Sequence, residues 1–130
     1  MVILLFSPQA YSVNIISNST ADTVSLSVAQ LRRIYSMRQV RWQNGTPIVV
    51  YVLANDHSLH QDFCKEQLQL FPYQLDRIWN KLTFSGYGVA PIIVANEQEL
   101  IQSVRSTKGA IGYVADISEV NDVNIITIDD

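Results

Sequence analysis

An unbroken apolar run at residues 48–53 constrains the fold of this chain most. It reads Ile-Val-Val-Tyr-Val-Leu and follows a turn signal, Gln-Asn-Gly-Thr-Pro, at residues 43–47. A strand with one face in water alternates apolar and polar residues, whereas this run is apolar throughout. Continuous apolarity is typical of a central strand that is covered on both faces. The run therefore predicts an α/β fold with residues 48–53 in the sheet interior.

Helix and strand patterns alternate along the rest of the chain. Further strands are predicted at residues 13–16, 89–95, 111–114 and 124–128. Helices are predicted from Ser25 or Ser27 to about residue 35, from residues 55–58 to 68, from residue 72 to about 82, and from Asn96 to Gly109. This order predicts one domain, residues 13–130, built as a three-layer α/β sandwich with a mixed, mostly parallel sheet.

Two glycines mark the joint between the last helix and the strand that follows it. Gly109 fits a left-handed position after a helix, because it has no Cβ to clash. Gly112, inside the start of the strand, indicates a bulge or a close approach of another element.

Composition and motifs argue against several classes of function. The chain has 130 residues, 48% of them hydrophobic, and a formal net charge of -3. Its length suits one domain with a real core, and its mild acidity gives no support for a nucleic-acid partner. The single cysteine, Cys64, lies in a helical pattern, where buried packing is expected rather than reactivity. We find no Gly-x-Ser-x-Gly, Walker or His-Glu-x-x-His motif, which argues against an enzyme, and no cofactor is expected.

Several segments together resemble a known family. Residues 26–35 read Leu-Ser-Val-Ala-Gln-Leu-Arg-Arg-Ile-Tyr, residues 41–45 read Arg-Trp-Gln-Asn-Gly, and residues 108–114 read Lys-Gly-Ala-Ile-Gly-Tyr-Val. Between them lie Phe63 and a Trp79…Phe84-Ser-Gly segment. In order and spacing the chain is similar to phosphate-type substrate-binding proteins of ABC transporters, in the type 2 periplasmic-binding superfamily. The resemblance runs from about residue 13 to the end, and it implies the fold of roughly one lobe of such a protein.

The resemblance also implies where a ligand would lie. In the family, an Arg and then Ser-Gly-Thr follow the central strand and hold the phosphate; here the Ser-Gly-Thr position reads His57-Ser58-Leu59, and the Arg and Thr are absent. A helix N-terminus at a strand end favours anions. The tentative ligand-binding residues are therefore Asp56, His57, Ser58 and Leu59, facing Ser85, Gly86 and Tyr87.

Simpler interpretations of these residues stay open. Asp56 or Ser58 could be a plain helix N-cap, and residues 84–88 a turn. His57 and His60, three residues apart, could share a metal, but solvated surface histidines are the default expectation. Trp42 and Trp79 are expected to pack in the core.

The first residues suggest export. An apolar stretch at residues 2–6 precedes small residues at positions 10 and 12, so residues 1–12 fit a truncated signal peptide cleaved after Ser12. The alternative is an ordinary first strand at residues 1–6. Export predicts a periplasmic location.

Two functions follow from these observations. The first is a small exported solute-binding domain for phosphate or another small oxyanion, connected with a membrane transporter or sensor. A second copy could complete its site in a homodimer. The alternative is a protein-interaction module of the same fold without a small ligand, which would show an exposed apolar patch. A basic cluster, Arg32, Arg33, Arg38 and Arg41, is either a solvated face or a partner surface.

Overall fold

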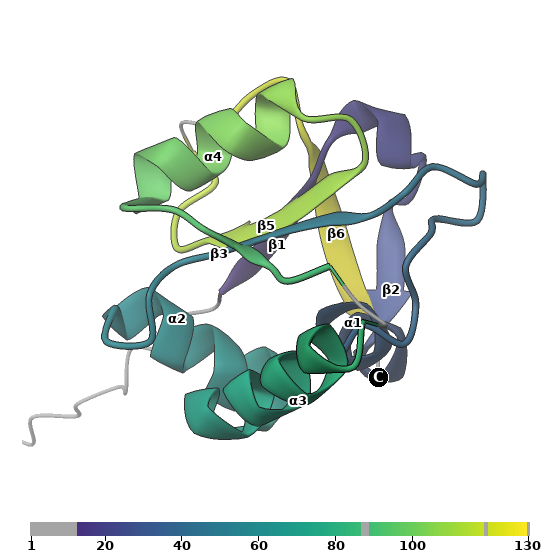
Figure 1. Cartoon of the computed structure of the whole chain (residues 1–130). Coiled ribbons are helices and arrows are strands. Elements are labelled where there is room, and N and C mark those ends of the chain that lie inside the picture. Colours follow the sequence, from purple (N-terminus) through teal and green to yellow (C-terminus); the bar gives the residue numbers. More distant parts are fainter. Residues whose placement is uncertain (1–12, 87–88, 119, 130) are drawn as a thin grey trace, which may run out of the picture.

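The structure is a computed structural model that describes residues 13–86, 89–118 and 120–129. A six-stranded sheet in the order β2-β6-β1-β5-β3-β4 runs through it (Figure 1). The strands are β1 (Asn14–Ser17), β2 (Ser25–Ser27), β3 (Val49–Val52), β4 (Ile92–Ile93), β5 (Ala110–Val114) and β6 (Asn124–Asp129). The pairs β2–β6, β3–β5 and β3–β4 are parallel, and β1 is antiparallel to both β5 and β6. The predicted mixed, mostly parallel sheet is confirmed.

Helices cover both faces of this sheet. They are α1 (Val28–Tyr35), α2 (Ser58–Phe63), α3 (Pro72–Phe84) and α4 (Glu97–Ser106), with a 3-10 turn η1 (Ser19–Ala21) and a π-helical segment η2 (Cys64–Leu68). Figure 1 shows α4 on one side of the sheet and α1, α2 and α3 on the other. This arrangement is the predicted three-layer sandwich.

The central strand lies where the apolar run placed it. β3 pairs with β5 on one side and β4 on the other, so it is inside the sheet. Tyr51 and Val52 are buried, while Val49 and Val50 are half-buried. The prediction of an interior strand is confirmed, although burial is complete only in its second half.

Successive residues of β5 contact the helices on opposite faces of the sheet. A Cβ at Gly112 would lie 2.5 Å from Leu100 Cδ2 and 2.9 Å from Val104 Cγ2, both on α4. The next side chain, Tyr113, points the other way and stacks on Phe63 of α2, with ring centroids 4.1 Å apart. Successive strand residues face opposite sides of a sheet. The close approach expected at Gly112 is confirmed, and α4 is the element that approaches.

Two predicted boundaries differ from the structure, and one strand was not predicted. The strand expected at residues 89–95 is only Ile92–Ile93, an exposed edge strand that begins after Pro91, a residue with no N–H to donate. The helix expected to reach Gly109 ends at Ser106, and Gly109 lies two residues past the C-cap, with the left-handed φ of +76° that the sequence predicted. The strand β2 was not predicted, because its three residues, Ser-Leu-Ser, carry little strand signal.

Helix caps follow local sequence. Ser27, not Ser25, caps α1, because its side chain accepts from the Gln30 N–H while the Gln30 side chain accepts from the Ser27 N–H. Asn96 caps α4 by accepting from the Glu99 N–H, as expected, and the Glu99 carboxylate reaches back to the Ala95 N–H (3.0 Å).

The predicted signal peptide, residues 1–12, lies outside the described residues. None of the helices in the described part of the chain has the length and apolar character that crossing a membrane requires.

Candidate functional site

The loop between β3 and α2 carries the first group of predicted ligand-binding residues. The His57 N–H donates to the Ala54 carbonyl oxygen (3.0 Å), and the Gln61 side chain donates to the Asn55 carbonyl oxygen (3.1 Å). The Asn55 side chain also donates to the carboxylate of Asp76 on α3. Side-chain hydrogen bonds therefore join this loop to α2 and to α3.

His57 is the N-cap of α2, which corrects the expectation that Asp56 or Ser58 would be. Its Nδ1 accepts a hydrogen bond from the Leu59 N–H (3.1 Å). An imidazole nitrogen can replace the usual cap oxygen because it also offers a lone pair to the free N–H groups of the first turn. The Leu59 N–H is consequently occupied unless His57 turns away.

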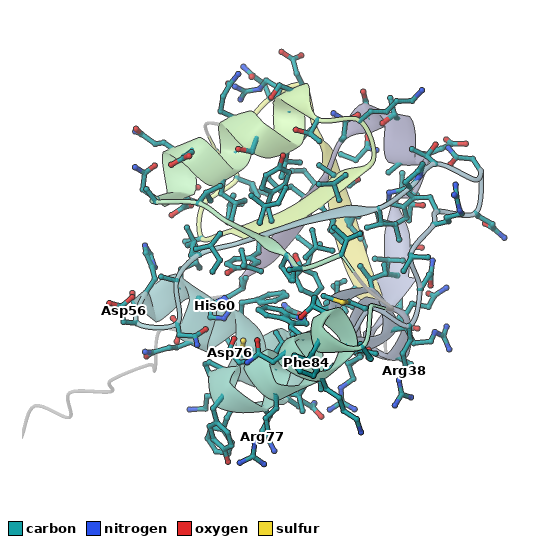
Figure 2. All side chains as sticks on the ribbon, in the orientation of Figure 1. Arg38, Asp56, His60, Asp76, Arg77 and Phe84 are labelled. Atoms are coloured by element: carbon teal, nitrogen blue, oxygen red, sulfur yellow. The ribbon has the colours of Figure 1, made fainter. Side chains whose placement is uncertain are left out.

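Ser58 keeps its polar groups free. It is exposed, and among the described residues neither its N–H nor its hydroxyl has a hydrogen-bond partner. Asp56, also exposed, lies on the outer side of the same loop (Figure 2). Ser58 is thus the residue of this loop best able to donate to a ligand.

The cavity beside Ser58 is acidic. It has a volume of about 430 Å³, and its lining residues are Val13, His57, Ser58, Leu59, Asp62, Glu97 and Ala115. Glu97 accepts from the Ala115 N–H (3.0 Å). Of the described residues, two carboxylates and no lysine or arginine line this space. A fully ionised anion would therefore be repelled, whereas a ligand with its own protons could donate to the carboxylates.

The second group of predicted site residues lies elsewhere. Ser85 is the C-cap of α3, and its hydroxyl donates to the Lys81 carbonyl oxygen (2.7 Å). Gly86, with φ +77°, lines a different cavity, together with Ile34, Val50 and others but with no residue of the Ser58 loop. Tyr87 is outside the described residues. The structure therefore does not bring Ser85 and Gly86 into the cavity that Ser58 lines.

His60 is fully buried, which corrects the expectation of two solvated histidines. Its Nδ1 lies 2.5 Å from the Tyr113 hydroxyl, and its Nε2 lies 3.5 Å from Cys64 Sγ. Burial lowers the pKa of His60 to about 4 and raises the pKa of the Cys64 thiol to about 12. Both groups are therefore neutral at pH 7, and the pair is a packed polar contact rather than an activated nucleophile.

Other candidates have structural roles. In the described ranges, no three His, Cys, Asp or Glu side chains gather closely enough to hold a metal ion. Trp42 and Trp79 are buried, and their indole N–H groups donate to the carbonyl oxygens of Gly109 (2.9 Å) and Tyr35 (2.6 Å). The expectation that both pack in the core is confirmed.

The sequence analysis missed the polar network around Tyr113. Tyr113 was singled out only as part of a strand motif, and His60 only as a partner of His57. The spacing of His60, Phe63 and Cys64, at i, i+3 and i+4, puts all three on one helix face, and this was the signal that could have placed His60 in the core.

Comparisons with known proteins agree with this architecture. A family model described as "PBP superfamily domain", where PBP stands for periplasmic binding protein, matches residues 8–125. No curated protein is significantly similar in sequence to the chain.

Solved structures share the fold at low sequence identity. One, from Clostridium perfringens, is described as a phosphate ABC transporter substrate-binding protein with bound phosphate; it is 19% identical, with a TM-score of 0.69 over 89% of this chain and 44% of its own. PstS from Borrelia burgdorferi is 15% identical, with a TM-score of 0.66 over 91% of this chain and 47% of its own. An ABC-type phosphate transport receptor from Vibrio cholerae is 14% identical, with a TM-score of 0.63 over 89% and 46%.

The chain thus spans less than half the length of the solved structures that it matches. It shares their fold over nearly all of its own length. Because the family model covers most of the sequence, the chain belongs to the periplasmic-binding-protein superfamily.

Proposed function

We propose that this chain is a solute-binding domain that takes a small oxyanion, with phosphate as the leading candidate, at the cavity beside Ser58. The observation that carries the proposal is the fold shared with phosphate-binding proteins over about nine-tenths of this chain, one of them solved with bound phosphate. The free N–H and hydroxyl of Ser58 supply two donors at the start of α2, after the loop that follows β3.

The carboxylates near Ser58 favour a protonated oxyanion over a fully ionised one. Asp62 and Glu97 repel a dianion but can each accept a hydrogen bond from a protonated ligand oxygen. Doubly protonated phosphate, a monoanion, offers such protons, while sulfate at neutral pH is a dianion that offers none. None of the described residues that line the cavity is an arginine. Compared with a site that has the arginine expected from the family, the missing charge-assisted hydrogen bond weakens phosphate binding by about one to two orders of magnitude. We therefore expect phosphate affinity no better than high micromolar.

Isothermal titration calorimetry at neutral pH tests the proposal with inorganic phosphate and, separately, with sulfate. We expect weak phosphate binding, no measurable sulfate binding, and loss of the phosphate signal in Ser58→Ala. Ser85→Ala is the matched control, because Ser85 lines neither the cavity nor its rim. Binding that survives Ser58→Ala unchanged would place the ligand elsewhere.

The same proposal includes export and a membrane partner. Cleavage after Ser12 would deliver the domain to the periplasm, where a transporter or membrane sensor would receive the bound solute. Mass spectrometry of the mature protein tests cleavage directly, and a chain that still carries residues 1–12 would contradict export.

The second candidate is an interaction module that binds no solute. It is favoured by exposed apolar side chains, among them Phe71, Tyr73, Phe84 and Ile93. Absence of any heat with phosphate, sulfate and small carboxylates would favour this candidate over solute binding.

A further inference from the structure

The solvent-facing side of α3 carries an unusual row of residues. Tyr73, Arg77, Lys81 and Phe84 follow one another at intervals of four, four and three, which places them on one face of the helix. All four are exposed, and Phe84 reaches 95% exposure and Tyr73 56%. We call these four residues the α3 stripe. It runs for nearly the full length of α3, about 20 Å.

The cations of the α3 stripe have no carboxylate partner in the part of the chain that the structure describes. Among the described residues, neither Arg77 nor Lys81 forms an ion pair. The Arg77 guanidinium lies 5.9 Å from the Tyr73 ring centroid, and Figure 2 shows Arg77 projecting away from the sheet. The one carboxylate of α3, Asp76, is half-buried and bonded to the Asn55 side chain instead. The stripe therefore presents two aromatic rings with two free positive charges between them.

The surroundings extend this character. Phe71, 63% exposed, stacks on Tyr73 with ring centroids 5.6 Å apart. An apolar groove of about 450 Å³ adjoins Phe71 and includes Lys65. On the neighbouring helix α1, Arg32 donates to the Leu68 carbonyl oxygen (2.7 Å), so its charge lies beside the same helical layer.

Charge is strongly divided along the chain. Residues 28–41 and 64–85, which contain α1, η2 and α3, hold seven of the nine lysines and arginines but only two of the twelve carboxylates. Their formal net charge is +5, and that of the remaining residues is −8. We call α1, η2 and α3 the basic layer; α2, on the same side of the sheet, carries Asp62 and no lysine or arginine. In a protein with a net charge of -3, this asymmetry would orient the basic layer toward an extended negative surface.

We propose that the α3 stripe docks on an anionic phospholipid bilayer. Tyrosine and phenylalanine rings are favourable at the level of lipid headgroups, and neighbouring lysines and arginines are attracted to anionic lipids. A bilayer matches two further observations: the stripe is an exposed helix face rather than the lining of a pocket, and further positive charge lies on α1 and η2, on the same side of the sheet. An acidic protein partner would need positive charge only where its own acidic patch makes contact, not over several helices. The surface is separate from the Ser58 cavity, so the inference does not depend on solute binding.

Sedimentation of the full chain with vesicles tests the inference. We expect binding to mixed phosphatidylcholine–phosphatidylglycerol vesicles, little binding to pure phosphatidylcholine vesicles, and weaker binding as salt increases. The double substitution Arg77→Gln and Lys81→Gln should weaken binding about 25-fold, since each charge near the surface contributes about fivefold. Phe84→Ser should weaken it about tenfold.

Matched controls use residues outside the basic layer: the half-buried Arg105 and the exposed Lys108 and Val24. Arg105→Gln with Lys108→Gln removes the same charge from the other side of the sheet, and Val24→Ser removes another exposed apolar side chain. We expect both controls to bind like the original chain, with unchanged circular dichroism for all variants. No preference for anionic vesicles, or equal losses in control and stripe variants, would overturn the inference; a stripe that serves an acidic protein partner would give the first of these results.

Discussion

The Tyr113 hydroxyl lies 2.5 Å from His60 Nδ1 and accepts a hydrogen bond from the Leu53 N–H at 2.8 Å. Because the hydroxyl oxygen already accepts from Leu53, its proton is free to point at His60. Nδ1 then acts as acceptor, and the other ring nitrogen, Nε2, carries the proton toward Cys64 Sγ. This chain of contacts joins β5, the end of β3 and α2 inside the core.

Removing the Tyr113 hydroxyl should destabilise the fold. Tyr113→Phe keeps the stacking on Phe63 but leaves a buried N–H and a buried ring nitrogen without partners. We expect a loss of about 2–3 kcal/mol in the free energy of unfolding, measured by urea denaturation. Tyr51→Phe is the matched control: its hydroxyl bonds only to the half-buried Thr107 hydroxyl (2.9 Å), and we expect a loss of about 1 kcal/mol or less. Equal losses would contradict the role of the Tyr113 network.

Stability should fall on mild acidification because of His60. Burial lowers the pKa of His60 to about 4 in the folded state, from the ordinary histidine value of 6.5. The unfolded chain therefore takes up a proton first, so the stabilisation is fully present above pH 6.5 and is lost as the pH falls toward 4. Between pH 7 and pH 5 the free energy of unfolding should drop by about 2 kcal/mol.

The variant His60→Gln provides the check on this pH dependence. It should be less stable at pH 7 but should lose much less stability between pH 7 and pH 5. Urea denaturation at several pH values measures both proteins. Since His57 remains in this variant, an undiminished pH dependence would assign the effect to another group.

Alanine at Gly109 should be poorly tolerated. Gly109 has φ +76°, and a Cβ there would overlap the backbone carbonyl oxygen of Pro47. Because backbone atoms cannot rotate away as a flexible side chain can, Gly109→Ala should cost more than about 3 kcal/mol or prevent folding. Gly45→Ala measures the cost of a positive φ without any steric overlap, because Gly45 has φ +87° and open space around it. This substitution should therefore lower the free energy of unfolding by about 1–2 kcal/mol. Thermal denaturation compares the two, and similar costs would argue against the overlap.

The Cys64 thiol should be unreactive until the chain unfolds. It is fully buried, and its pKa is raised to about 12, so the folded protein at pH 8 contains almost no accessible thiolate. A thiol-specific colorimetric disulfide reagent should label the native chain only slowly and the urea-unfolded chain at once. A cysteine placed at the exposed position of Val24 in a Cys64→Ala background should react immediately when folded. Rapid labelling of native Cys64 would show that the core opens locally.

The sequence alone was enough to predict the features that depend on residues close to one another in the chain. The apolar run at 48–53 predicted an interior strand, and Gly109 predicted a left-handed residue. The sequence also predicted caps at Asn96 and at either Ser25 or Ser27, of which Ser27 is the one observed. These features need only local spacing and local backbone conformation. The family resemblance then supplied the expected single-lobe fold and the place to look for a ligand.

Only the tertiary structure decided what depends on contacts far apart in the chain. His60 reads as a surface residue until the sheet brings Tyr113, 53 residues later, to its ring. The two predicted halves of the ligand site, around Ser58 and around Ser85, line different cavities, because α3 carries Ser85 to its far end. Most basic residues fall in two separate stretches of the sequence, 28–41 and 64–85, and these stretches come together only because α1, η2 and α3 pack on the same side of the sheet. Local propensity cannot anticipate such outcomes, since burial and partner choice follow from how the elements pack.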